Sequence, residues 1–135
     1  MRTQVAIIGA GPAGLLLSQL LHRRGVDSIV VERRSRAEVE ATVRAGVLEQ
    51  GTVDVLTECG AGERLAREAF LHRGISLRFG GATHHIDIHE LTGGKHVIIY
   101  PQHEVLKDLI ALRLREGGRI FFEALDARID GIDGA

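Results

Sequence analysis

Residues 5–14 read VAIIGAGPAG, and this stretch decides the fold of the 135-residue chain. Its first four residues form an apolar run with the length of a strand buried on both faces of a parallel sheet. The glycines that follow have G-x-G-x-x-G spacing. Gly9 permits a tight turn, Gly11 lets a pyrophosphate approach the backbone, and Gly14 lets a helix pack closely on the strand. Pro12 suits the first position of that helix, whose free N–H groups face a phosphate.

An acidic residue stands eighteen positions after the last glycine of this motif. Between them we expect a helix over 15–24, closed by Gly25, and a second strand over 28–31, which leads into Glu32. A carboxylate at that point can accept hydrogen bonds from the hydroxyls of an adenosine ribose. Glycine-rich turns alone are common and can serve packing only. Strand, turn, helix, strand and acid in this order indicate an adenine dinucleotide site.

Composition narrows the partners and the compartment. Hydrophobic residues make up 44% of the chain and the net charge is -1, so we expect neither a nucleic acid nor a membrane as partner. The single cysteine, Cys59, allows no intrachain disulfide, which fits a reducing cytoplasm. The apolar N-terminus is too interrupted by glycines for a signal peptide or a membrane span.

In the rest of the chain the spacing of apolar residues changes twice, from helical to alternating and back. Helices are expected over 33–46, 47–58, 63–71 and 102–115. From Ile75 the period is two, which predicts a small antiparallel sheet from strands over 75–79, 84–89 and 96–100. Final strands are expected over 119–125 and 127–135. Strands 119–122 and 28–31 would join 5–8 as one half of a doubly wound parallel sheet, so the predicted fold class is α/β.

Two further strings narrow the function. RAGVLEQGTVDVL begins at Arg44, and YPQHEVLKDL surrounds Gln102. With the opening motif, they make the chain resemble the flavoprotein aromatic hydroxylases over all 135 residues, and RAGVLEQG is far more specific than the glycine motif. The resemblance covers about the N-terminal third of such an enzyme. It implies that residues 1–135 are a partial doubly wound, Rossmann-like FAD/NAD(P)-binding domain with a small inserted antiparallel sheet, and that the substrate domain is absent.

The chemistry implied by this resemblance is that of an FAD-dependent monooxygenase. The parent enzyme would take electrons from NADH or NADPH and would hydroxylate 4-hydroxybenzoate to 3,4-dihydroxybenzoate with O2. The pocket for this small aromatic acid would lie outside the chain, so the 135 residues alone are expected to be inactive. A homodimer is the expected assembly of the full-length enzyme.

The resemblance also implies a set of cofactor-binding residues. They are Gly9, Gly11, Ala13, Gly14, Glu32, Arg33, Thr42, Val43, Arg44, Ala45, Gly46, Val47 and Gln102. The first four would hold the FAD pyrophosphate, and the loop from Thr42 to Val47 would lie along the flavin. Arg44 would donate to phosphate or ribityl oxygens, as would Gln102. Three plainer interpretations stay open: a solvated Arg44, a Gln102 that only opens its helix, and a turn glycine at Gly46.

In the resembled family the segment after the ribose-binding acid, here residues 33–44, helps to select the nicotinamide coenzyme. Arg33 and Arg34 would attract the 2′-phosphate of NADPH, whereas Glu38 and Glu40 would repel it. Arg44 is assigned to FAD and does not count toward the phosphate. We therefore expect a parent enzyme that accepts NADH at least as well as NADPH.

Two other functions share the opening motif. A nicotinamide dehydrogenase domain would have the same strand, turn and acid, although RAGVLEQG and the inserted strands disfavour it. A non-catalytic nucleotide-binding fragment is the second alternative. The run 84–89 also places His85, Asp87 and His89 on one face of a strand, and these residue types bind zinc or iron. Because alternating isoleucines make this an ordinary amphipathic strand, we expect no metal.

Overall fold

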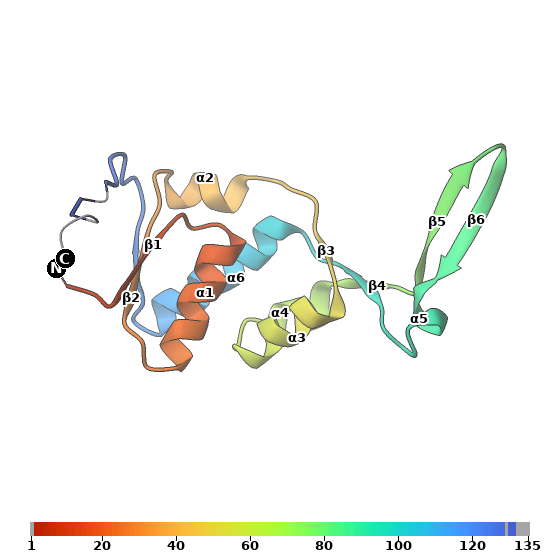
Figure 1. Ribbon diagram of the computed structural model, residues 1–135, viewed down its shortest axis with the longest axis horizontal. Helices are drawn as coiled ribbons and strands as arrows, with labels where there is room; N and C mark the ends of the chain where they lie inside the picture. Colours follow the sequence, from red (N-terminus) through yellow and green to blue (C-terminus); the bar gives the residue numbers. More distant parts are fainter. Residues whose placement is uncertain (1, 129, 132–135) are drawn as a thin grey trace. The chain divides into compact units, whose positions relative to one another are not determined.

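The computed structural model describes residues 2–128, 130 and 131 (Figure 1). Its contacts divide the chain into two compact units. Unit 1 comprises residues 1–42 and 106–135, and unit 2 comprises residues 43–105. Each unit is described by itself.

Unit 1 is built on a three-stranded parallel sheet. Its elements are β1 (Val5–Ile8), α1 (Pro12–Arg23), β2 (Ser28–Val31), α2 (Arg36–Ala41), most of α6 (Gln102–Arg115) and β8 (Arg119–Phe121). The strand order is β1-β2-β8, with both neighbouring pairs parallel. The predicted half of a doubly wound sheet is therefore confirmed, and β1, β2 and α6 have the predicted bounds.

The two faces of β1 differ in exposure. Ile7 is buried, but Ile8 on the opposite face is 60% exposed. The expectation of burial on both faces is therefore wrong for this strand. Successive side chains of a strand point to opposite faces, so this pattern means that the described residues of unit 1 cover one face of β1.

Buried polar contacts join α1 to β2 and to the second half of α6. The hydroxyl oxygens of Ser18 and Ser28 lie 3.2 Å apart, and Arg113 Nε donates to Ser18 Oγ at 3.2 Å. All three residues are at most 3% exposed. Burying such groups is costly unless they are hydrogen-bonded, so this cluster fixes the position of α1, and with it the turn that precedes α1.

Unit 2 contains two small sheets instead of the one predicted. Its elements are β3 (Val47–Leu48), α3 (Gln50–Glu58), α4 (Glu63–Glu68), β4 (Phe70–His72), β5 (Gly74–Phe79), β6 (Ala82–Asp87), α5 (Ile88–Leu91) and β7 (Val97–Ile99). Strands β3 and β4 pair antiparallel with the two sides of β7, whereas β5 and β6 form a separate hairpin. The helices expected over 47–58 and 63–71 are therefore too long, because their ends pair with β7 as strands.

Other bounds also differ from the prediction. The strand expected over 84–89 ends at Asp87, whose side chain accepts a hydrogen bond from the Glu90 N–H at 2.9 Å and starts α5. His89 therefore lies on a helix. The strand expected over 119–125 ends at Phe121. Within 127–135, residues 129 and 132–135 lie outside the described part, and the others form no strand.

Among the described residues, no helix is both long enough and apolar enough to cross a membrane.

Candidate functional site

The glycine turn between β1 and α1 has the backbone geometry that its sequence requires. Gly9 has a φ of 107°, a conformation that residues with a side chain rarely adopt. A Cβ on Gly14 would stand 2.2 Å from the carbonyl oxygen of Gly9, so only glycine lets α1 approach the turn this closely. A Cβ on Gly11 would meet no described atom within 4 Å. The space in front of Gly11 is therefore open to a ligand.

The start of α1 can receive an anion. Gly11 is the residue before the helix, Pro12 opens it, and among the described residues no side chain caps it. The first N–H groups of a helix have no partner inside it and carry the positive end of its dipole. Ala13, which is exposed, and Gly14 contribute such groups. This arrangement suits a phosphate.

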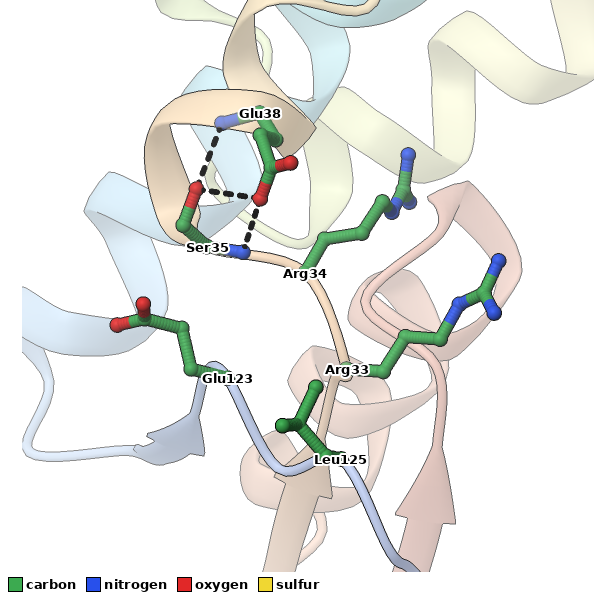
Figure 2. Close-up of a pocket in the computed structure, with 6 residues that line it drawn as sticks. All are labelled: Arg33, Arg34, Ser35, Glu38, Glu123 and Leu125. Carbon is green, nitrogen blue, oxygen red and sulfur yellow. Dashed lines mark hydrogen bonds between the residues drawn. The ribbon is translucent and has the colours of Figure 1, made fainter.

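A pocket of about 550 Å³ opens beside the end of β2 (Figure 2). Its lining residues are Arg33, Arg34, Ser35, Glu38, Glu123 and Leu125. The backbone on its two sides is joined by hydrogen bonds, from Glu123 N–H to the Arg34 carbonyl and from Ala124 N–H to the Glu32 carbonyl, both at 3.0 Å. The pocket therefore lies between segments that are far apart in the sequence and directly beside the predicted ribose-binding acid.

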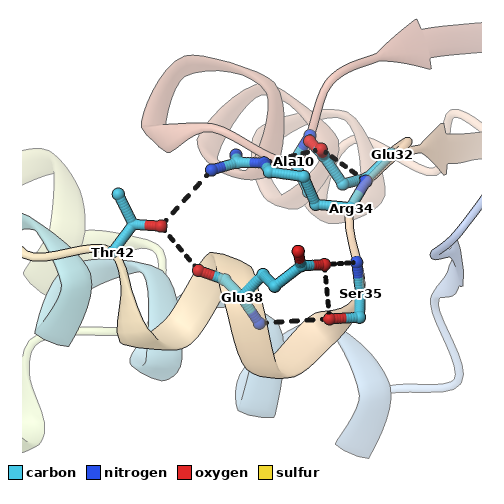
Figure 3. A network of polar contacts seen from close by, with 6 residues as sticks. All are labelled: Ala10, Glu32, Arg34, Ser35, Glu38 and Thr42. Carbon is cyan, nitrogen blue, oxygen red and sulfur yellow. Dashed lines mark hydrogen bonds and ion pairs between the residues drawn. The ribbon is translucent and has the colours of Figure 1, made fainter.

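Glu32 has a buried side chain whose two oxygens are both hydrogen-bonded (Figure 3). Oε2 accepts from the Ala10 backbone N–H at 2.8 Å. Oε1 accepts from the backbone N–H and from Nε of Arg34, each at 3.0 Å. Burial raises the pKa of Glu32, but these hydrogen bonds and the charge of Arg34 outweigh it and hold the pKa below its ordinary value. The carboxylate is therefore ionised at neutral pH.

This ionisation predicts how stability depends on pH. Since the pKa of Glu32 is lower in the folded state than its ordinary value of 4.5, its contribution is complete above that value. The contribution is lost as the pH falls through the folded-state pKa. We expect urea unfolding between pH 7 and pH 3 to show a smaller acid-dependent loss of stability in Glu32→Gln than in the unaltered chain. Equal losses would contradict the assignment of this titration to Glu32.

Most charged residues of the following segment have partners within it. Ser35 and Glu38 form a capping box at the start of α2: Ser35 Oγ accepts from the Glu38 N–H at 3.2 Å, and Glu38 Oε2 accepts from the Ser35 N–H at 2.8 Å. Ser35 Oγ also donates to Glu38 Oε2 at 2.7 Å, and this bond together with the one from the Ser35 N–H lowers the pKa of Glu38, so it carries a negative charge at the pocket. Arg36 pairs with Glu40 at 2.6 Å.

The remaining predicted site residues lie in unit 2, except Thr42, which ends the first segment of unit 1. Val43, Arg44, Ala45 and Val47 are exposed. The Tyr100 N–H donates to the Gly46 carbonyl at 2.9 Å, which brings this loop to the residues just before Gln102. A Cβ on Gly46 would stand 2.1 Å from the carbonyl oxygen of Tyr100. A glycine is therefore required here because the Tyr100 backbone packs against it, and not because the chain makes a turn that needs a positive φ.

Two contributors to the pocket were not predicted from the sequence. Glu123 has a φ of 59° and is the only non-glycine residue of the described part with positive φ. Leu125 beside it is 83% exposed. Glutamate and leucine give no sequence signal for a place in a pocket. The pairing of β2 with β8 brings these two residues to the site.

The run 84–89 is not a single strand, so the predicted placement of His85, Asp87 and His89 on one strand face is wrong. His85 lies on β6, where its Nδ1 is 3.1 Å from Ser76 Oγ, whereas His89 lies on α5. Asp87 caps that helix. In the part of the chain that the structure describes, no three metal-binding side chains lie together.

Two relatives in sequence are hydroxylases of aromatic acids. The chain is 44% identical over 129 residues to p-hydroxybenzoate hydroxylase of Acinetobacter baylyi, a match that covers 96% of the chain and 32% of the relative. It is 37% identical over 67 residues to 3-(3-hydroxy-phenyl)propionate/3-hydroxycinnamic acid hydroxylase 2 of Burkholderia vietnamiensis, covering 50% of the chain and 12% of the relative. The chain thus spans about a third or less of these relatives. The predicted resemblance to flavoprotein aromatic hydroxylases is confirmed.

Solved structures give the same fold. PqsL of Pseudomonas aeruginosa matches with a TM-score of 0.81 at 21% identity, over 90% of the chain and 33% of that protein. The p-nitrophenol 4-monooxygenase of Pseudomonas putida matches with a TM-score of 0.74 at 22% identity, over 87% of the chain and 31% of that protein. The model of the FAD binding domain family matches residues 2–127. The chain therefore belongs to the FAD binding domain family.

Proposed function

We propose that this chain is the FAD-binding portion of an aromatic hydroxylase that converts 4-hydroxybenzoate to 3,4-dihydroxybenzoate. The observation that carries the proposal is the buried, ionised Glu32 beside an open glycine turn. An ionised carboxylate accepts hydrogen bonds from ribose hydroxyls, and the start of α1 accepts a pyrophosphate. The 44% identity to p-hydroxybenzoate hydroxylase supports the reaction.

The residues present fit the adenosine and pyrophosphate half of FAD. The backbone at Gly11 has space for the pyrophosphate, because a Cβ there would meet no described atom within 4 Å. Glu32 would orient the ribose, and the N–H groups of Ala13 and Gly14 would neutralise phosphate charge. Arg44 and Gln102 are proposed for phosphate or ribityl oxygens. Bound flavin would supply the redox chemistry with O2, while these residues bind and orient it.

Ligand titration tests the binding part of this proposal. We expect the purified 135-residue chain to bind FAD in preference to FMN, because Glu32 is proposed to bind the adenosine ribose that FMN lacks. Fluorescence quenching and NMR titration to millimolar ligand would measure both affinities. A clear preference for NAD⁺ over FAD would favour the dehydrogenase alternative instead.

Product analysis tests the reaction. A polypeptide that contains these 135 residues and the remaining length of the relatives should form 3,4-dihydroxybenzoate from 4-hydroxybenzoate, reduced nicotinamide and O2. The 135 residues alone should form none, because the chain spans only 32% of the hydroxylase it resembles. Product from the short chain, or none from the long one, would contradict the proposal.

The pocket supports a coenzyme preference. Arg34 Nε is engaged with Glu32, which offsets its positive charge, while Glu38 and Glu123 place two further carboxylates at the pocket. A carboxylate about 5 Å from a phosphate costs on the order of 1–3 kcal/mol at a partly solvated site. We therefore expect the long polypeptide to use NADH at least as well as NADPH. Comparing kcat/KM for the two coenzymes decides the point, and a tenfold preference for NADPH would be the contrary result.

A further inference from the structure

Three N–H donors hold the two oxygens of the Glu32 carboxylate. Two are backbone N–H groups, of Ala10 at 2.8 Å and of Arg34 at 3.0 Å. The third is Nε of Arg34, which shares Oε1 with its own backbone N–H at 3.0 Å. Backbone donors occur wherever the main chain has this path. The guanidinium is the one donor to this carboxylate, among the described residues, that depends on the identity of a side chain.

The other end of the Arg34 guanidinium is also held (Figure 3). Its Nη1 donates to Thr42 Oγ1 at 3.5 Å, and that hydroxyl donates to the Glu38 carbonyl at 2.6 Å, at the end of α2. The Arg34 side chain is 34% exposed, so it is neither fully buried nor free in solvent. A guanidinium fixed at two points can hold a carboxylate in one orientation, because its planar donors have a rigid geometry.

We propose that Arg34 is a positioning residue, whose guanidinium fixes the Glu32 carboxylate so that its remaining lone pair faces a ribose hydroxyl of FAD. This inference rests on the proposed role of Glu32. It gives Arg34 a function different from the attraction of a coenzyme phosphate that the sequence suggested. An ionised carboxylate has about four acceptor sites, and the N–H donors occupy three of them, which leaves one for a hydroxyl group.

A double-mutant cycle tests whether Arg34 acts through Glu32. The variants are Arg34→Gln, Glu32→Gln and both together, with FAD affinity of the full 135-residue chain measured by NMR titration to millimolar FAD. We expect Arg34→Gln to weaken FAD binding about five- to tenfold, since the bond is charge-assisted but partly exposed. In the Glu32→Gln background the same change should have less than a twofold effect, because no carboxylate remains to be positioned.

Two further measurements separate positioning from general stability. The matched control is Arg36→Gln, which removes an arginine–glutamate pair on α2 that does not touch Glu32, and it should leave FAD affinity within twofold. The pH profile is the second measurement. Without the guanidinium the pKa of Glu32 should rise, so the loss of FAD affinity on acidification should begin at higher pH in Arg34→Gln.

The outcomes distinguish this proposal from the one on which it rests. Unchanged affinity in Arg34→Gln, or an equal loss in both backgrounds, would overturn the positioning role while leaving FAD binding intact. Unchanged affinity in Glu32→Gln would overturn the role of Glu32 itself, as would a failure of the unaltered chain to bind FAD at millimolar concentration. The proposal is supported if Arg34→Gln lowers FAD affinity only when Glu32 is present, and if the pH profile shifts as described.

Discussion

Gly14→Ala is expected to lower the stability of unit 1 by about 3 kcal/mol, the upper end of the usual cost of overpacking. The added Cβ would stand 2.2 Å from the Gly9 carbonyl oxygen and 3.1 Å from Cγ2 of Ile7. The nearer atom belongs to the backbone of the turn, so relief requires α1 to move away from β1. The change in the free energy of unfolding can be measured by urea denaturation monitored by circular dichroism.

Gly11→Ala is the matched control for this prediction. Gly11 lies in the same turn with a φ of -80°, and its added Cβ would meet no described atom within 4 Å. Its stability should therefore change by about 1 kcal/mol or less, the difference between glycine and alanine before a helix. FAD affinity should still fall, because the methyl group enters the space proposed for the pyrophosphate. Equal destabilisation by the two substitutions would contradict this division of roles.

Glu32→Ala is expected to weaken FAD binding by about 1.5–3 kcal/mol, the range for hydrogen bonds to a charged group. This corresponds to roughly a ten- to 150-fold increase in Kd. The substitution removes the ribose acceptor and also leaves the N–H groups of Ala10 and Arg34 without their carboxylate. Flavin fluorescence titration of the 135-residue chain, supported by NMR where binding is weak, measures the effect.

Glu40→Ala provides the comparison for that substitution. Glu40 also pairs with an arginine, Arg36, but it does not line the pocket. Its removal should leave FAD affinity within about twofold, since an exposed ion pair contributes at most about 1 kcal/mol to stability. An unchanged FAD affinity in Glu32→Ala would show that the adenosine ribose is bound elsewhere.

Elements with strong local signals could be predicted from the sequence. The bounds of β1, β2 and α6 follow from continuous apolar runs and a clear helical period. Strands β3 and β4 could not be predicted, because two or three residues show no period and their partner β7 is distant in the sequence. The start of α2 was a missed local signal, since Ser35 and Glu38 have the spacing of a capping box.

In the candidate site, too, some features could be predicted from the sequence and others could not. The glycine spacing and the following acid gave the turn and Glu32, because each has a fixed position in a strand–helix–strand unit. The partners of Glu32 could not be deduced. Arginine usually lies in solvent, and nothing in the sequence distinguishes Arg34 from Arg33, although only Arg34 bonds to the carboxylate among the described contacts. The left-handed backbone conformation at Glu123 could not be predicted either, because glutamate rarely adopts it.

The order of β2 and β8 in the sheet has a consequence for folding kinetics. The paired residues Ile29 and Arg119 are about 90 positions apart, and all of unit 2 lies between them in the chain. Closing so long a loop costs chain entropy before the contacts between the strands can stabilise the pair. Non-local strand pairs are therefore expected to form late. During synthesis β1, α1 and β2 leave the ribosome well before β8. We therefore expect the pocket beside Glu32 to be completed at the end of folding. In a pulsed hydrogen-exchange experiment, the backbone amides of Glu32 and Ala124 should be among the last to become protected.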